Sequence, residues 1–536
     1  MEFDGNYYPY PSRREVVYGR KGMVCTSQAL AAQAGLDALK KGGNAIDAIL
    51  ATAIAMVVLE PTSNGLGSDA FAQVWFHGKL YGINGSGWSP KALTWKALHD
   101  KGYEEVPWRG WVPVMVPGAV AAWAALHERF GKLPFKDLFD AAISYAEEGY
   151  VVMPNVAMMF EAHAKTFESY KNEEAFSALF PLFYPDGKPK RAGEILRLPD
   201  VARSLKLIRD SHGRELYEGE IADAIDVWSK KTGGYIHKED LAEYKPQWVD
   251  PLHVNYHGYD VWELPPNGHG MVVLMALNIA KGWDFSSMPA AEAVHRQIEA
   301  MKLAYIDGKH FIADPDYMSV DPQYFLSEEY ASKRRSLIGD SALMPEPVKL
   351  NDGGTVYLCA ADGEGNMVSY IQSNFRGYGS GIVIPHYGVT LNDRGCNFYM
   401  DQKSDNCVGP RKRSYHTIIP GFLTKDGKAV GPFGVMGGFM QPQGQFQVLL
   451  NSIEDHLNPQ AALDKPRWQW MGGKDIETES ALGAPLIEAL RVRGHEMTVR
   501  DTVIGAYGRG EIIWRNDKGI LAGGTEPRAD GVVAAW

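Results

Sequence analysis

The sequence is poor in several features that mark common protein classes. Its 536 residues include only four cysteines, Cys25, Cys359, Cys396 and Cys407, and no two of them form a C-x-x-C pair. Scattered thiols in a chain of this length are typical neither of a disulfide scaffold nor of a structural zinc site. We therefore expect reduced thiols and a cytoplasmic protein.

Long apolar runs and an excess of positive charge are also missing. The longest apolar run, residues 45–59, contains Asp47 and is too short to cross a bilayer, and residues 1–24 lack the apolar core of a secretory signal. The formal net charge of −11 argues against a nucleic-acid-binding protein, which would carry a basic patch. The sequence therefore predicts neither a nucleic acid nor a membrane as a partner.

Most motifs of known chemistry are absent or incomplete. There is no P-loop, no H-E-x-x-H and no G-x-S-x-G motif. The stretch GLGSDAF, residues 65–71, imitates a dinucleotide fingerprint, but a helix pattern and a proline precede it, so we interpret it as a close-packed glycine loop. His253, His257 and His269 lie on a strand, a turn and a loop, which disfavours a metal site. No metal and no cofactor are expected.

Helix and strand patterns alternate in blocks rather than in a strict β-α-β order. A helix capped by Ser27 and a second helix that ends near Leu59 precede strands around residues 70–85, and helices follow between residues 117 and 208. Strand patterns dominate residues 355–423. This order predicts a layered α+β fold that forms one folded unit.

A glycine-rich segment precedes a strand that begins on a threonine. Gly353 and Gly354 stand before Thr355 in the hairpin pattern NDGGTVYLCAADGEGNMVSYIQS. A threonine hydroxyl needs a base, and one available base is the α-amino group that cleavage of the preceding bond would free, with a reference pKa of about 7.7–8. Freely rotating glycines would allow the bent geometry of an N-to-O acyl shift. Taken alone, a strand after a glycine-rich turn is the commoner interpretation.

A second glycine pair, Gly437-Gly438, stands between a strand pattern and a helix pattern. Adjacent glycines at such a place can turn backbone N–H groups toward a developing oxyanion. In isolation, the pair also fits a simple strand-to-helix turn.

Further segments occur in one order along nearly the whole chain. They include GGNAIDAILATAIAMVVLEPTSNGLGSDAF, LPPNGHG, YGSGIVIPHYGVTLNDRG, MGGFMQPQGQ and GGTEPRADG. This series resembles the γ-glutamyltransferase (glutathione hydrolase) family of N-terminal nucleophile hydrolases. The resemblance implies a four-layer αββα sandwich. It also implies a precursor that cuts itself into a large subunit, residues 1–354, and a small subunit, residues 355–536, which stay associated.

The resemblance carries the catalytic roles onto five residues. Thr355 is implied as the nucleophile exposed by cleavage after Gly354, and Ser373 as its hydrogen-bond partner. Gly437 and Gly438 are implied as the oxyanion-binding glycines.

The residues implied to bind substrate depart from the family pattern. Ser86 stands where the family has a glutamate-reading arginine, and Phe375 stands where an asparagine is expected. A serine is a poor replacement for a guanidinium in binding a carboxylate, because only the guanidinium forms a bidentate, charged pair.

The remaining departures lie in the second half of the chain. Arg394 and Asn397 replace a glutamine and an aspartate, and His416-Thr417 replaces a serine pair. Only residues 398–415 lie between Asn397 and His416, too few for the long lid loop of many transpeptidases. Arg394 is the one new cation that the sequence indicates here, and either it binds a carboxylate or it is a solvated surface residue.

These features predict a self-processing amidohydrolase or acyltransferase of the glutathione-hydrolase-like and cephalosporin-acylase-like branch. The leading substrates are γ-glutamyl amides such as glutathione. The alternatives are another small acyl-amide, as in a cephalosporin acylase or an oxamate-like substrate, and a non-catalytic binding protein with this fold. The expected partners are a small-molecule amide and the two processed fragments themselves, with a homodimer as a possible assembly.

Overall fold

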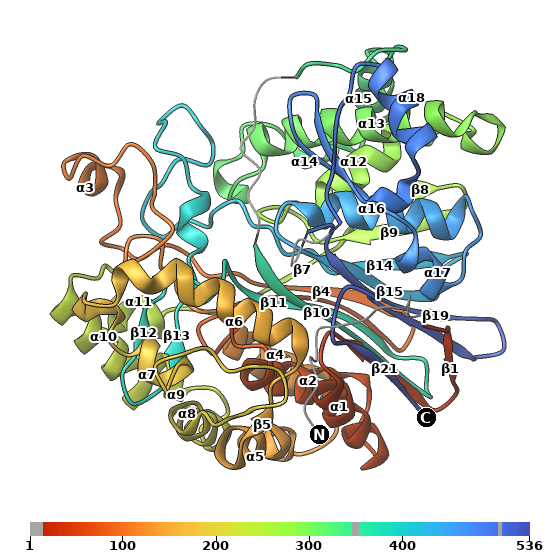
Figure 1. The fold of residues 1–536 in the computed structure, drawn as a ribbon. Helices are drawn as coiled ribbons and strands as arrows, with labels where there is room; N and C mark the ends of the chain where they lie inside the picture. The colour runs from red at the N-terminus through yellow and green to blue at the C-terminus, as the bar shows by residue number, and fades with distance from the viewer. Residues whose placement is uncertain (1–13, 346–352, 502–505) are drawn as a thin grey trace.

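The computed structural model describes residues 14–345, 353–501 and 506–536. Two seven-stranded sheets lie face to face between two layers of helices (Figure 1). This arrangement confirms the predicted αββα sandwich. Asn351 and Asp352, the start of the glycine-rich segment, lie outside the described residues.

The first sheet has the order β21-β2-β10-β11-β3-β4-β7. Its strands are β2 (Gly22–Thr26), β3 (Asp69–Phe76), β4 (Lys79–Gly85), β7 (Gln247–Val249), β10 (Gly354–Asp362), β11 (Met367–Phe375) and β21 (Val532–Ala535). The second sheet has the order β1-β20-β19-β15-β14-β9-β8. Its strands are β1 (Val17–Gly19), β8 (Leu252–Tyr256), β9 (Tyr259–Glu263), β14 (Gly421–Lys425), β15 (Lys428–Met436), β19 (Arg509–Arg515) and β20 (Leu521–Thr525).

The helices form two separate outer layers. Around the first sheet lie α1 (Ala29–Lys40), α2 (Ala45–Leu59), α4 (Ala119–Phe130), α5 (Asp140–Glu148), α6 (Pro154–Phe167), α8 (Pro199–Asp210) and α10 (Glu220–Thr232). Around the second lie α12 (Gly270–Ala280), α13 (Ala290–Phe311), α15 (Glu328–Arg335), α16 (Met440–Ile453), α17 (Pro459–Asp464) and α18 (Ala484–Val492). No helix in the described part of the chain is long and apolar enough to cross a membrane.

Smaller elements complete the fold. The short helices are α3 (Trp95–His99), α7 (Leu179–Phe183), α9 (Glu215–Glu218), α11 (Lys238–Ala242) and α14 (Pro322–Phe325). The short strands are β5 (Tyr150–Val151), β6 (Ile195–Leu196), β12 (Val383–Ile384), β13 (Val389–Thr390), β16 (Trp468–Gly472), β17 (Asp475–Thr478) and β18 (Glu496–Val499).

The apolar run of residues 45–59 forms the fully buried helix α2. Asp47 fits inside this run because its carboxylate accepts the backbone N–H groups of Asn44, Lys132 and Leu133. It thus completes a capping box with Asn44 and anchors the loop after α4.

Two smaller sequence predictions have different outcomes. Ser27 does not cap α1, because Gln28 occupies that position and the Ser27 hydroxyl donates to Glu60 instead. The close-packed glycine loop is confirmed at Gly67, where an added Cβ would lie 2.3 Å from the carbonyl oxygen of Thr390.

Candidate functional site

Thr355 lies at the start of β10, in the middle of the first sheet. Gly354 pairs with Phe375 and Val356 pairs with Gln372, so the single residue Thr355 faces two residues of β11. This bulge re-aims the β11 side chains locally, as bulges beside active sites often do. One of the two facing residues is Ser373.

Two hydroxyl groups converge on the carbonyl group that precedes Thr355. Thr355 Oγ1 lies 2.7 Å and Ser373 Oγ 2.8 Å from the carbonyl oxygen of Gly354, and the two hydroxyl oxygens lie 3.1 Å apart. The backbone N–H of Phe375 donates to Ser373 Oγ at 2.7 Å, which fixes the serine hydroxyl in place. The threonine hydroxyl therefore lies against the carbonyl group of the peptide bond between Gly354 and Thr355.

The structure gives a different reason for the glycines than the sequence did. A Cβ on Gly353 would lie 2.9 Å from the Phe375 ring and 3.2 Å from the Cα of Gly438, and one on Gly354 would lie 3.3 Å from the Cα of Ser63. Close packing therefore disfavours a side chain at both positions, more strongly at Gly353 than at Gly354.

Gly437 and Gly438 adopt φ angles of +140° and +56°, in the region that favours glycine. Neither of their N–H groups has an acceptor within residues 14–345, 353–501 and 506–536. The following residue, Phe439, is held through its carbonyl oxygen by the Tyr305 hydroxyl of α13 at 2.5 Å. The glycines therefore lie beside the Gly353 segment with two N–H groups available to an oxyanion.

Ser86 lies in a buried hydrogen-bond network. Its hydroxyl contacts Oδ1 of Asn84 at 2.7 Å and Oδ1 of Asn267 at 3.3 Å, and its side chain is fully buried. Its hydroxyl is therefore engaged with other protein groups.

Arg394 is buried, which excludes the solvated surface position that the sequence left open. It is 1% exposed, its Nη1 donates to Thr417 Oγ1 at 2.7 Å, and its Nε lies 3.9 Å from Oδ2 of Asp69. His416 Nε2 contacts the same Asp69 oxygen at 2.9 Å. Two residues of the predicted substrate-binding set, Arg394 and His416, thus meet at one carboxylate, and a third, Thr417, contacts Arg394.

Burial dominates the protonation of this cluster. It raises the pKa of Asp69 to about 7 even though Arg394 acts to lower it, and it lowers the pKa of Arg394 to about 10. Burial also lowers the pKa of His416, so the imidazole is neutral and its Nε2–H donates to Asp69. Sequence reasoning missed Asp69, although an aspartate directly before the apolar strand pattern AFAQVWF was a usable signal.

Phe375 and Asn397 have different surroundings. Phe375 is buried with a φ of +79°, a strained conformation for a non-glycine residue, and its ring lies under the guanidinium of Arg394. Asn397 lines a pocket of about 1240 Å³, and its Nδ2 has no hydrogen-bond partner in the described chain. Sequence reasoning missed two cations that also line this pocket, Lys309 and Arg376.

The family model described as Gamma-glutamyltranspeptidase matches residues 31–536. The chain belongs to this family. It is therefore an N-terminal nucleophile hydrolase with the corresponding αββα fold, in which Thr355 is the second residue of β10 in the central hairpin.

Relatives within the family carry different names. The chain is 32% identical to the glutathione hydrolase-like YwrD proenzyme of Bacillus subtilis, covering 96% of this chain and 98% of that protein. It is 30% identical to the oxamate amidohydrolase proenzyme of Klebsiella pneumoniae, with the same coverage. The crystal structure of a cephalosporin acylase from Bacillus halodurans is similar with 54% identity and a TM-score of 0.97, covering 100% of this chain and 99% of that one.

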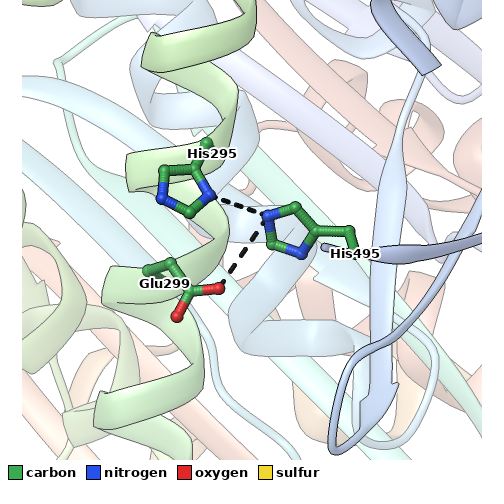
Figure 2. Close-up of side chains that lie close together, drawn as sticks. All are labelled: His295, Glu299 and His495. Carbon is green, nitrogen blue, oxygen red and sulfur yellow. Dashed lines mark hydrogen bonds and ion pairs between the residues drawn. The ribbon is translucent and has the colours of Figure 1, made fainter. Parts of the chain in front are cut away.

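A second buried cluster offers three potential metal-ligating atoms, from His295 and Glu299 of α13 and from His495 (Figure 2). His295 Nδ1 lies 2.8 Å from His495 Nε2, and Glu299 Oε1 lies 3.9 Å from that same nitrogen. The Lys302 ammonium, however, lies 2.8 Å from Glu299 Oε1 and already balances its charge. We interpret the cluster as a polar link between residues before and after Thr355, since a divalent cation there would face this ammonium.

The hydroxyl of Thr355 is predicted to be essential for cutting. Thr355→Ala removes the group that contacts the Gly354 carbonyl, so we expect it to stay a single 536-residue chain. Thr355→Ser keeps a hydroxyl and is expected to cut. Intact mass and a denaturing gel measure both, and efficient cutting of the alanine variant would refute self-processing through this residue.

Gly438→Val is predicted to lower turnover by about 10²–10³, the scale of losing one oxyanion donor. The expected cause is displacement of the N–H by a side chain that disfavours a φ of +56°. Gly427→Val is the matched control, because Gly427 has a φ of +69° in a turn with open space around it. Equal turnover of the two variants, measured by steady-state kinetics, would contradict an oxyanion role.

The His295–His495 pair is predicted to make stability fall in acid. Burial lowers the pKa of His495 to about 3 and also lowers that of His295. Their stabilising contribution is therefore complete above pH 6.5 and is lost as the pH falls toward 3, because the unfolded chain binds more protons.

At pH 5 a single such histidine has lost about 2 kcal/mol. We expect the melting temperature of His495→Gln to fall less between pH 7.5 and pH 5 than that of the wild type. His310→Gln, at an exposed position of the same helix, is the control. If the melting temperature of His495→Gln falls between pH 7.5 and pH 5 as much as that of the wild type, the histidine pair does not take up protons on unfolding.

Proposed function

We propose that this chain is the precursor of an amidohydrolase that cuts itself between Gly354 and Thr355. Thr355 Oγ1 attacks the Gly354 carbonyl carbon, the C–N bond breaks, and an ester joins the two fragments. Water then hydrolyses the ester, which leaves a carboxylate on Gly354 and a free α-amine on Thr355. The observation that carries this proposal is the contact of both hydroxyls, Thr355 and Ser373, with the Gly354 carbonyl oxygen.

The mature site would use the same hydroxyl on a substrate amide. The α-amine of Thr355 takes the hydroxyl proton as Oγ1 attacks, and the N–H groups of Gly437 and Gly438 stabilise the oxyanion. The amine then returns the proton to the leaving nitrogen as the C–N bond breaks. Water resolves the acyl-enzyme by the reverse proton path, or an amine acceptor does so in transfer mode.

The sequence favoured γ-glutamyl amides as substrates, but the contacts of the site favour an acyl group without an amino-acid head. The Ser86 hydroxyl is engaged by Asn84, His416 donates to Asp69, and Arg394 binds Thr417. The Ser86 hydroxyl, the His416 Nε2 and one nitrogen of Arg394 are therefore engaged with other protein groups. The likeness to a protein named cephalosporin acylase supports the same choice.

One observation keeps γ-glutamyl amides as the second candidate. Nε and Nη2 of Arg394 are buried without hydrogen-bond partners in the described residues. A guanidinium with two N–H groups to spare suits a carboxylate, and the glutathione hydrolase-like name of one relative is consistent with such a substrate.

Two anilides that differ by a single group separate these candidates. Glutaryl-4-nitroanilide equals γ-glutamyl-4-nitroanilide without its α-amino group. We predict a kcat/KM at least about tenfold higher for the glutaryl compound. The ammonium group of the γ-glutamyl compound would lose its hydration on binding, and no carboxylate of the site would replace the lost water. Steady-state kinetics of cut wild-type protein give the ratio, and faster hydrolysis of the γ-glutamyl compound would restore glutathione-type substrates.

A further inference from the structure

The pocket of about 1240 Å³ opens next to the residues that surround the nucleophile. Two of its lining residues, Phe439 and Arg376, follow directly on Gly438 and Phe375. Its volume is sufficient for a molecule larger than a dipeptide. What this pocket holds therefore bears on which amide the enzyme cleaves.

Lys309 enters the pocket from the last turn of α13 without a counter-ion. Its Nζ lies 4.5 Å, 4.6 Å and 5.4 Å from the ring centroids of Phe439, Tyr415 and Tyr399. The residue is 8% exposed, and in the described part of the chain Nζ has no hydrogen-bond or carboxylate partner. Aromatic faces offset only part of the cost of burying an ammonium. Burial lowers the pKa of Lys309 to about 8, so the side chain is mostly protonated at neutral pH.

Arg376 provides a second cation on the same wall. Its guanidinium lies 3.6 Å from the ring centroid of Trp108, and its Nε is buried without a hydrogen-bond partner among the described residues. The carboxylate of Asp393 accepts a hydrogen bond from the backbone N–H of Arg376. Its ion pair, at 3.2 Å, is with the guanidinium of Arg109 and not with that of Arg376. Arg376 is therefore also left without an ion-paired carboxylate in the described chain.

The acidic residues of the lining do not neutralise these cations. Asp307 is buried, but its two oxygens are taken by Arg334 at 2.6 Å and 2.7 Å and by the Tyr330 hydroxyl at 2.6 Å. The other acidic lining residues are exposed or half-buried: Glu104, Glu105, Asp401 and Asp405. The deep wall of the pocket is thus cationic and aromatic.

We propose that Lys309, assisted by Arg376, binds a carboxylate of the substrate, so that the enzyme selects amides bearing this second charged group. The assignment rests on the proposed amidohydrolase function and names its substrate class. The carboxylate belongs either to a dicarboxylic acyl group or to the amine that is released. Arg394 is the weaker anchor, because it has Asp69 as a counter-ion and does not line the pocket.

Three amides distinguish these sources: glutaryl-4-nitroanilide, valeryl-4-nitroanilide and the valeryl amide of 4-aminobenzoate. The first carries a carboxylate on the acyl group, the third carries one on the amine, and the second carries none. Lys309→Met should lower kcat/KM for one carboxylate-bearing amide by about 10–100-fold relative to the uncharged anilide, the scale of a lost charged hydrogen bond. Lys309→Arg should recover part of this loss.

Lys333→Met is the control, since it removes one positive charge at an exposed position of α15 and should leave all three ratios unchanged. Circular dichroism and the cut fragments on a gel show that each variant has folded and processed. If the ratio of kcat/KM for a carboxylate-bearing amide to that for the uncharged anilide is the same in wild type and Lys309→Met, Lys309 does not bind the substrate carboxylate, and the assignment is overturned. A charge preference that survives Lys309→Met and vanishes in Arg394→Gln also overturns it.

Binding of glutarate, measured by calorimetry, tests Lys309 without turnover. We expect wild type to bind glutarate at least about tenfold more tightly than Lys309→Met does, for the same electrostatic reason. Equal affinities refute the anchor. A cut wild-type protein that hydrolyses none of the amides would refute the proposed function, and the glutarate comparison would still decide the role of Lys309.

Discussion

The pairing of β10 with β11 is the interaction on which the site and its integrity depend. β10 begins at Gly354, one residue before Thr355, and it also pairs with β2, so it lies between a strand from before the proposed cut and a strand from after it. The second sheet likewise pairs β14 with β9, across the proposed cut. Breaking the one peptide bond between Gly354 and Thr355, at the start of β10, removes none of these strand pairings. Each pairing is held by hydrogen bonds along its whole length. A protein built this way can cut its chain without separating its halves.

Buried charge is the second organising constraint. Asp69, Arg394 and His416 lie in a region without water access, where an unpaired charge is costly and a paired one is rigidly placed. Arg394 Nε lies 3.9 Å from Oδ2 of Asp69, and both side chains are buried. A charged residue whose type suggests ligand binding can therefore stabilise the fold instead. Only the residues around it show which of these two roles it has.

Helix α13 connects the buried His295–Glu299–His495 cluster with the pocket. At one end His295 and Glu299 meet His495, while nearer the other end Tyr305 holds the carbonyl of Phe439. Lys309, one turn further on, lies over the ring of that phenylalanine. One helix from before the proposed cut thus positions the residue after the glycine pair and forms part of the pocket wall. A change in its packing would reach the site through these contacts.

The sequence determined the features that depend on local pattern. The buried α2, the β3–β4 hairpin and the strand that starts beside Thr355 follow from periodicity, capping and turn residues. The ordered series of motifs indicated the family and its layered fold. Gly437 and Gly438 could be found as well, because a glycine pair between a strand and a helix is itself a local signal.

Tertiary structure decided everything that depends on which residues meet. Gly353 is a glycine because Phe375 and Gly438 approach it, and no local pattern contains that contact. The burial of Arg394 beside Asp69, a residue far from it in the chain, is visible only in the folded structure. No pattern in the sequence singled out Lys309, and its place beside three aromatic rings is visible only in the folded structure. The physical reason is common to all three cases: burial and charge pairing are set by contacts between distant segments, and these exist only once the layers have packed.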